Sequence, residues 1–224
     1  MPLSLAREQM IEQQVRAWEV LDARVLSILR TVAREQYVPD SQRFLAFADV
    51  EIPLSNSQHM LRPSVAGRLL QALELSGTDR VLEVGAGSGF LTACLAKASA
   101  HVRSLEVFPD LADLARAHLT AAGVGNTEVI TADAMQYGGP LESAAGGAGR
   151  YHAIAVTGSL PVYDNRFERL LEIGGRLFVI VGDAPVMDAR LVRRVSEDGW
   201  VTTSLFETVV DPLVNARRPP GFSF

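Results

Sequence analysis

Residues 80–90 read RVLEVGAGSGF. The first five form a short apolar run typical of a buried strand, and a helical pattern, FLTACLAKAS, begins at Phe90. Between them, glycines at positions 85, 87 and 89 permit a tight turn and let a ligand approach the backbone. Because open α/β sheets bind ligands at the carboxyl ends of their strands, this stretch predicts a ligand-binding loop in an α/β fold.

Strand and helix patterns alternate from residue 63 onward. We expect helices at 63–75, 90–99, 110–123 and 164–172, and strands at 80–84, 101–107, 127–131, 151–157 and 176–182. Asp198-Gly199 separates two further strand-like runs and indicates a hairpin. The pattern predicts a doubly wound, mostly parallel, seven-stranded sheet with helices on both faces and an antiparallel C-terminal hairpin. We expect residues 138–149, rich in Gly and Ala, to be a flexible surface loop.

A helical extension precedes this sheet. We expect helices at 5–17 and 22–34, followed by an irregular segment at 36–61. A loop of this length in a compact domain usually has a function. We therefore expect residues 1–62 to be N-terminal helices and a loop that covers the substrate and cofactor. Residues 63–224 are expected to be a Rossmann-like domain, which is one compact unit.

Composition excludes several classes of protein. The formal net charge of −5 argues against a general electrostatic grip on nucleic acid. A single cysteine rules out an internal disulfide and is typical of a reducing compartment. The chain has neither a signal-peptide pattern nor an apolar run long enough to cross a membrane, so we expect a cytoplasmic protein without a membrane partner. The four histidines are too scattered to suggest a metal site.

The spacing of the glycines separates two ligand classes. A dinucleotide fingerprint is G-x-G-x-x-G, but here the third glycine would fall on Phe90, which disfavours a nicotinamide-dependent oxidoreductase. With Glu83 before it, the loop resembles the E/D-x-G-x-G-x-G motif of class I S-adenosylmethionine-dependent methyltransferases. That resemblance implies that Glu83 helps to hold the methionine end of the cofactor, directly or through water, and that the loop Gly85–Gly89 packs beside it.

Two acidic residues follow later strands in the order that such a site requires. Glu106 ends the second strand, where a carboxylate can accept hydrogen bonds from both ribose hydroxyls. Asp133 follows the strand at 127–131, and the methyltransferase resemblance implies a contact with the adenine amino group. We assign to the same cofactor site the neighbouring residues Ala86, Ser88, Leu91, Val107, Ala134 and Thr157.

Nearly the whole chain resembles the protein-L-isoaspartate O-methyltransferase family. The similar segments are MIEQQVRAWEVLDARVLSILRTVAREQYVPD at 10–40, AFADVEIPL at 46–54, the glycine loop, and FETVVDPLV at 206–214, which is similar to the family's F-V-P-L ending. The resemblance implies protein repair: methylation of the α-carboxylate of isoaspartyl residues in damaged proteins, and a monomer. Since a carboxylate is already ionised at pH 7, such an enzyme needs positioning and exclusion of water rather than a strong base.

One segment departs from the family's pattern. The family's substrate loop reads approximately G-x-G-Q-T-I-S-x-P, whereas residues 55–63 read SNSQHMLRP. Gln58 matches, but His59 takes the Thr position and Leu61 the Ser position, and leucine cannot donate a hydrogen bond. We take Gln58 and His59 as the candidate catalytic residues, with His59 a base or a group that positions the substrate. Two alternatives remain open, namely a same-fold methyltransferase with a different acceptor and a non-catalytic cofactor-binding module.

Overall fold

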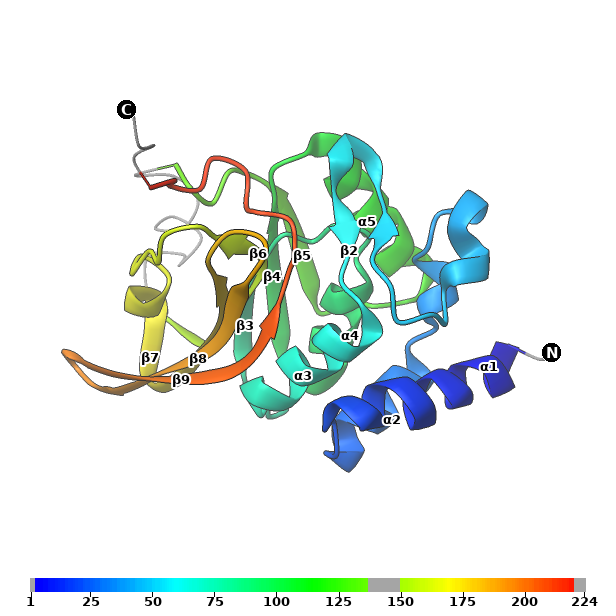
Figure 1. Cartoon of the computed structure of the whole chain (residues 1–224), viewed down its shortest axis with the longest axis horizontal. Coiled ribbons are helices and arrows are strands. Elements are labelled where there is room, and N and C mark those ends of the chain that lie inside the picture. The colour runs from blue at the N-terminus through cyan, green and yellow to red at the C-terminus, as the bar shows by residue number, and fades with distance from the viewer. Residues whose placement is uncertain (1–2, 137–149, 220–224) are drawn as a thin grey trace.

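The structure, a computed structural model, describes residues 3–136 and 150–219. A seven-stranded sheet forms its centre, in the order β5-β4-β3-β6-β7-β8-β9 (Figure 1). The strands are β3 (Arg80–Val84), β4 (His101–Glu106), β5 (Thr127–Thr131), β6 (Tyr151–Leu160), β7 (Leu171–Val181), β8 (Met187–Ser196) and β9 (Gly199–Thr208). β3 to β7 pair in parallel, while β8 pairs antiparallel with β7 and with β9. The mostly parallel sheet and its C-terminal hairpin are therefore confirmed.

Three helices cover one face of this sheet: α3 (Pro63–Leu73), α4 (Phe90–Ala98) and α5 (Pro109–Ala121). Alternate strand residues such as Val81 and Phe178 pack against them, because successive side chains of a strand point to opposite faces. The opposite face buries Leu82 and Val156 beneath irregular chain and one short helical turn, η6 (Glu168–Leu170). The described residues thus place a thin layer, rather than a second set of long helices, on this face.

The prediction of a helix at 164–172 is wrong. Only η6 is helical there, and β7 already begins at Leu171. A strand forms here instead of a helix because Leu171 pairs with Tyr151 and is fully buried. Gly174, with φ of +84°, lies in the irregular stretch before the regular pairing resumes at Arg176. The expected loop at 138–149 lies outside the described residues.

The N-terminal extension is helical, as expected. α1 (Leu3–Met10) continues through further helical turns at Ile11–Val15 and Arg16–Trp18, and α2 (Ala23–Thr31) follows. Asp22 caps α2 by accepting a hydrogen bond from the backbone N–H of Arg24 at 2.8 Å. Residues 34–60 contain short turns, η3 (Arg34–Gln36), η4 (Asp40–Leu45) and η5 (Ser55–Ser57), and a two-stranded antiparallel sheet of β1 (Ile52–Pro53) and β2 (His59–Met60).

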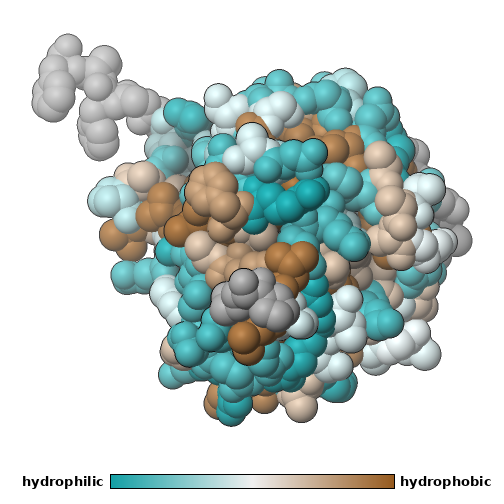
Figure 2. All heavy atoms as spheres, turned by 90° about the vertical axis from the view of Figure 1, so that its right-hand side faces the viewer, coloured by the Kyte–Doolittle hydropathy of each residue, from teal (hydrophilic) through white to brown (hydrophobic). Residues whose placement is uncertain are grey.

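The extension packs against the helical layer beside α3 and α4 (Figure 1). Its buried side chains, Met10, Ile11 and Val15 among them, belong to the same hydrophobic cluster as those of α3 and α4. The face that carries the start of the chain shows small apolar patches separated by hydrophilic side chains (Figure 2). The apolar side of these helices is therefore largely buried in the core.

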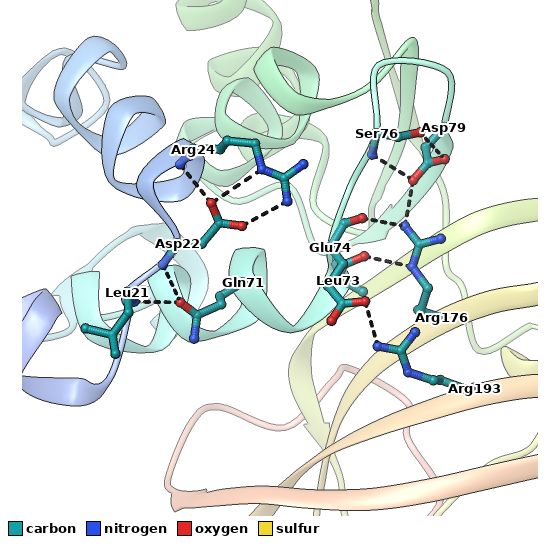
Figure 3. A network of polar contacts seen from close by, with 10 residues as sticks. All are labelled: Leu21, Asp22, Arg24, Gln71, Leu73, Glu74, Ser76, Asp79, Arg176 and Arg193. Carbon is teal, nitrogen blue, oxygen red and sulfur yellow. Dashed lines mark hydrogen bonds and ion pairs between the residues drawn. The ribbon is translucent and has the colours of Figure 1, made fainter.

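Polar contacts at the end of α3 reinforce this packing (Figure 3). Gln71 accepts hydrogen bonds from the backbone N–H groups of Leu21 and Asp22 at 2.7 and 2.9 Å. Arg176 on β7 donates to the carbonyls of Leu73 and Glu74 and to the carboxylate of Asp79. Because this end of α3 contacts both the extension and the sheet, we propose that residues 1–62 and 63–224 fold as one unit.

Candidate active site

A cavity opens at the carboxyl ends of the parallel strands. One side, which we call the strand-end wall, consists of residues of the glycine loop after β3, of the carboxyl-terminal ends of β4 and β6, and of the segments that follow β4 and β5. The other side, which we call the loop wall, consists of residues from 51–61 and from 210–214. The cavity therefore lies where the sequence places a ligand, between the sheet and two segments that are distant in the chain.

Glycine is required in the loop after β3. Gly85, Gly87 and Gly89 have φ values of +94°, +52° and +85°, a region that other residues rarely adopt. A Cβ at Gly85 would lie 2.3 Å from the Oγ1 of Thr157, and one at Gly89 would lie 3.2 Å from the Cα of Ala115. The loop is thus packed between β6 and α5, which fixes its backbone beside the cavity.

Glu106 lies on the strand-end wall, and the residue is 5% exposed. Its Oε2 accepts a hydrogen bond from the backbone N–H of Gly87 at 2.9 Å, and its Oε1 accepts one from Phe108 at 3.1 Å. Each carboxylate oxygen has a second lone pair. Glu106 therefore holds the glycine loop in place and keeps acceptor capacity for a pair of hydroxyl groups.

Asp133 stands beyond β5 on the same wall. Its Oδ1 accepts a hydrogen bond from the N–H of Met135, and its Oδ2 accepts one from the Nδ2 of Asn215, both at 2.7 Å. The second bond joins this wall to the segment after residue 210. Of the other residues expected at the cofactor site, Ala86, Ser88, Leu91, Val107, Ala134 and Thr157 also line the cavity.

Glu83 is not on the cavity wall. It is fully buried behind the loop, where its Oε2 accepts hydrogen bonds from Thr92 on α4 at 2.5 Å and from Ser104 on β4 at 2.6 Å. Its Oε1 has no partner among the residues described. Burial raises the pKa of this carboxyl to about 8, although the two hydroxyl groups oppose that shift. Glu83, the acidic residue of the motif, therefore packs between the sheet and α4. Gly89 is also absent from the cavity wall.

The loop wall carries the two candidate catalytic residues. The Nδ1 of His59 lies 2.8 Å from the Oδ2 of Asp211, and the Nε2 of Gln58 donates to the carbonyl of Asn56 at 3.2 Å. Asp110 at the start of α5 accepts hydrogen bonds from Ser55 and Asn56 and so ties this loop to the helical layer.

Three charged residues of the cavity were missed by the sequence reasoning: Arg34, Glu51 and Asp211. Burial raises the pKa of Glu51. With Glu106 and Asp133, the described residues thus place four carboxyl groups and one arginine on the cavity wall. This excess of acidic groups suits a ligand with positive charge. Asp211 lies in the quoted segment FETVVDPLV, but nothing in the sequence paired it with His59.

Arg34 is a buried cation in the wall of the cavity. It donates to the carbonyls of Ala46 and Leu61 at 3.2 and 2.9 Å, and its guanidinium lies 4.8 Å from the ring centre of Phe90. Its Nη1 has no partner among the described residues, and burial lowers its pKa to about 10. The motif REQYVPD contains this arginine, so the sequence held a signal for it.

No group of three or more His, Cys, Asp and Glu side chains in residues 3–136 and 150–219 is arranged to hold a metal ion. None of the helices in these ranges is long and apolar enough to cross a membrane.

Comparisons with known proteins agree with the geometry. A family model described as protein-L-isoaspartate(D-aspartate) O-methyltransferase matches residues 5–218. A protein-L-isoaspartate O-methyltransferase from Methanoculleus marisnigri is 38% identical over 202 residues, 90% of this chain and 88% of that protein. Another, from Rhodopseudomonas palustris, is 35% identical and covered to 93% on both sides. A structure from Plasmodium falciparum, described as a protein of this kind in complex with S-adenosyl-L-homocysteine, has the same fold, with a TM-score of 0.77, 20% identity, and coverage of 93% of this chain and 98% of that one.

Proposed function

The chain belongs to the protein-L-isoaspartate(D-aspartate) O-methyltransferase family, and from this premise we propose that it methylates isoaspartyl carboxylates with S-adenosylmethionine as the methyl donor. The observation that carries the proposal is the cavity at the strand ends, where the glycine loop and Glu106 meet a loop from the family's substrate segment. Repair of damaged proteins is the biological role that follows from such a reaction.

The polar groups and the charge of the cavity suit the cofactor. Glu106 would bind the ribose, Asp133 would lie near the adenine, and the backbone of Gly85 to Ser88 would approach the methionine part. Four carboxyl groups around the cavity favour a sulfonium cation over an uncharged ligand. When bound, this cofactor supplies a methyl group attached to a positively charged sulfur, which is a strong electrophile.

The protein's own residues have a limited chemical task. An isoaspartyl carboxylate is ionised at neutral pH, so one of its oxygens attacks the methyl group without loss of a proton. A bond from carboxylate oxygen to methyl carbon forms as the bond from carbon to sulfur breaks, and the two opposite charges cancel. Gln58 and His59 on the loop wall would position the acceptor, while apolar neighbours such as Leu54 and Leu61 would exclude water.

A transfer assay tests the proposal. The protein is incubated with S-adenosylmethionine labelled in its methyl group and with matched peptides that contain isoaspartate or aspartate at one position. We expect label on the isoaspartyl peptide alone. Glu106→Gln should weaken binding of S-adenosylhomocysteine at least about tenfold because it removes a charged acceptor, whereas Asp188→Asn, on β8 away from the cavity, should bind as the wild type does. Tight cofactor binding without label on the isoaspartyl peptide would contradict the proposed acceptor.

We also propose that the protein acts as a monomer in the cytoplasm, on protein or peptide substrates and without nucleic acid. Its single cysteine, Cys94, is buried and cannot form an internal disulfide, so the fold is compatible with a reducing compartment. Light scattering over a range of protein concentrations tests the monomer, since a mass that doubles with concentration would contradict it.

A further inference from the structure

Two positions that differ from the family's pattern contact each other. His59 stands where the substrate loop G-x-G-Q-T-I-S-x-P has Thr, and Asp211 stands where the F-V-P-L ending has Val. They are 152 positions apart, yet the Nδ1 of His59 lies 2.8 Å from the Oδ2 of Asp211. Both side chains are on the loop wall of the cavity and about one-third exposed.

The pairing leaves one polar atom of the ring for a ligand. Nδ1 is engaged by Asp211, and Nε2 of His59 has no partner among the described residues. Two neighbours on the loop wall differ from it: Leu61, at the family's Ser position, has no polar side-chain atom, and the Nε2 of Gln58 donates a hydrogen bond to the backbone carbonyl of Asn56.

Two further charged residues, Glu51 and Arg62, lie on either side of β2 in the chain. Glu51 interacts electrostatically with Arg62, Asp211 and His59. The Nη2 of Arg62 donates a hydrogen bond to the Oγ1 of Thr208 at the end of β9. Asp211 is thus the charged group in direct contact with the ring.

We propose that Asp211 is a positioning residue that orients His59, and that the Nε2 of His59 makes the hydrogen bond to the isoaspartyl residue which Leu61 is unable to make. This inference rests on the proposed function and names the group that selects the acceptor. No proton is transferred in this role. His59 holds the acceptor while the methyl group moves, so it contributes to binding of the peptide rather than to the chemical step.

Kinetics of three variants test the inference: His59→Phe, Asp211→Ala and the double variant. A hydrogen bond that involves a charged partner contributes about 1.5–3 kcal/mol, so we expect the KM for an isoaspartyl peptide to rise about 10- to 100-fold in His59→Phe, with little change in kcat. Asp211→Ala should raise KM in the wild-type background and add little in the His59→Phe background, because it acts through the ring. His59→Gln, which keeps a polar group, should recover part of the affinity.

A purely structural role of Asp211 predicts another result. Pro212 and Leu213 also line the cavity, so a displaced C-terminal segment would weaken the binding of S-adenosylhomocysteine. We expect that affinity to stay within about twofold of the wild type in both single variants, as in the control Asp188→Ala. Equal effects of Asp211→Ala in both backgrounds, or an unchanged KM in His59→Phe, would overturn the inference.

Calorimetric binding of the isoaspartyl peptide to the protein loaded with S-adenosylhomocysteine separates the two proposals, because it needs no turnover. If the wild type methylates and binds this peptide but the variants match it, only the inference about His59 and Asp211 fails. If the wild type neither methylates nor binds the peptide, the proposed function fails and this inference fails with it. Peptide binding that is weakened about 10- to 100-fold in His59→Phe supports the inference.

Discussion

Glu83 gives the sharpest quantitative prediction. Its carboxyl is fully buried, and burial raises its pKa from 4.5 to about 8. Between these two values the folded protein keeps a proton that the unfolded chain has lost, so the free energy of unfolding falls as the pH rises. The decline approaches about 1.4 kcal/mol per pH unit and amounts to ~2 kcal/mol between pH 6 and pH 8 from this group alone.

Glu83→Gln removes this dependence. The glutamine cannot ionise, and its carbonyl oxygen can still accept the hydrogen bonds from Thr92 and Ser104. Urea unfolding of the cofactor-free wild type and variant at pH 6, 7 and 8 measures the difference. We expect the variant to gain ~2 kcal/mol relative to the wild type across this range, and Glu207→Gln, on the exposed side of β9, to gain nothing. A constant difference between wild type and Glu83→Gln would refute the reasoning, since it would mean that this carboxyl is ionised in the folded protein, as it is in the unfolded chain, throughout this window.

Three further substitutions have distinct expected outcomes. Gly85→Ala places a Cβ 2.3 Å from the Oγ1 of Thr157 at a positive φ, so we expect at least about tenfold weaker binding of S-adenosylhomocysteine in a calorimetric titration. Arg34→Ala removes hydrogen bonds to two backbone carbonyls and a ring contact, so chemical unfolding should show a loss of about 3 kcal/mol, whereas Arg43→Ala on the surface should show no measurable loss. Arg176→Met frees the end of α3 from β7 and should lower the free energy of unfolding by about 2 kcal/mol, with faster hydrogen exchange at the C-terminal turn of that helix; unchanged exchange there would contradict the role of this arginine.

Regular elements with local signals were predictable from the sequence. β3 and β5 have the expected bounds, because each is a short stretch with β-branched residues between turn residues. The failure at 164–172 has a physical cause: Phe167, Leu170 and Leu171 imitate helical spacing, but Leu171 pairs with Tyr151 in the sheet. Pairing between strands is a long-range interaction that a local pattern does not contain.

The site was predictable where backbone position alone determines it. Glu106 and Asp133 lie on the wall of the cavity because the ends of parallel strands meet at one edge of the sheet. Glu83 lies on a strand as well, but the direction of its side chain is fixed by contacts with α4 and β4. The contact between His59 and Asp211 depends on how two distant loops fold over the strand ends, which spacing in the sequence does not reveal.

The construction of the loop wall has a consequence for biosynthesis. The ribosome synthesises residues 51–61 early, but the segment at 210–214 that faces the same cavity begins 149 positions after residue 61. A nascent chain that has reached β7 holds the glycine loop and Glu106, yet it lacks the part of the loop wall at 210–214. We therefore expect a ligand to stabilise the completed chain but not the ribosome-bound intermediates. The parallel strands would then assemble through their own packing, before a ligand can bind.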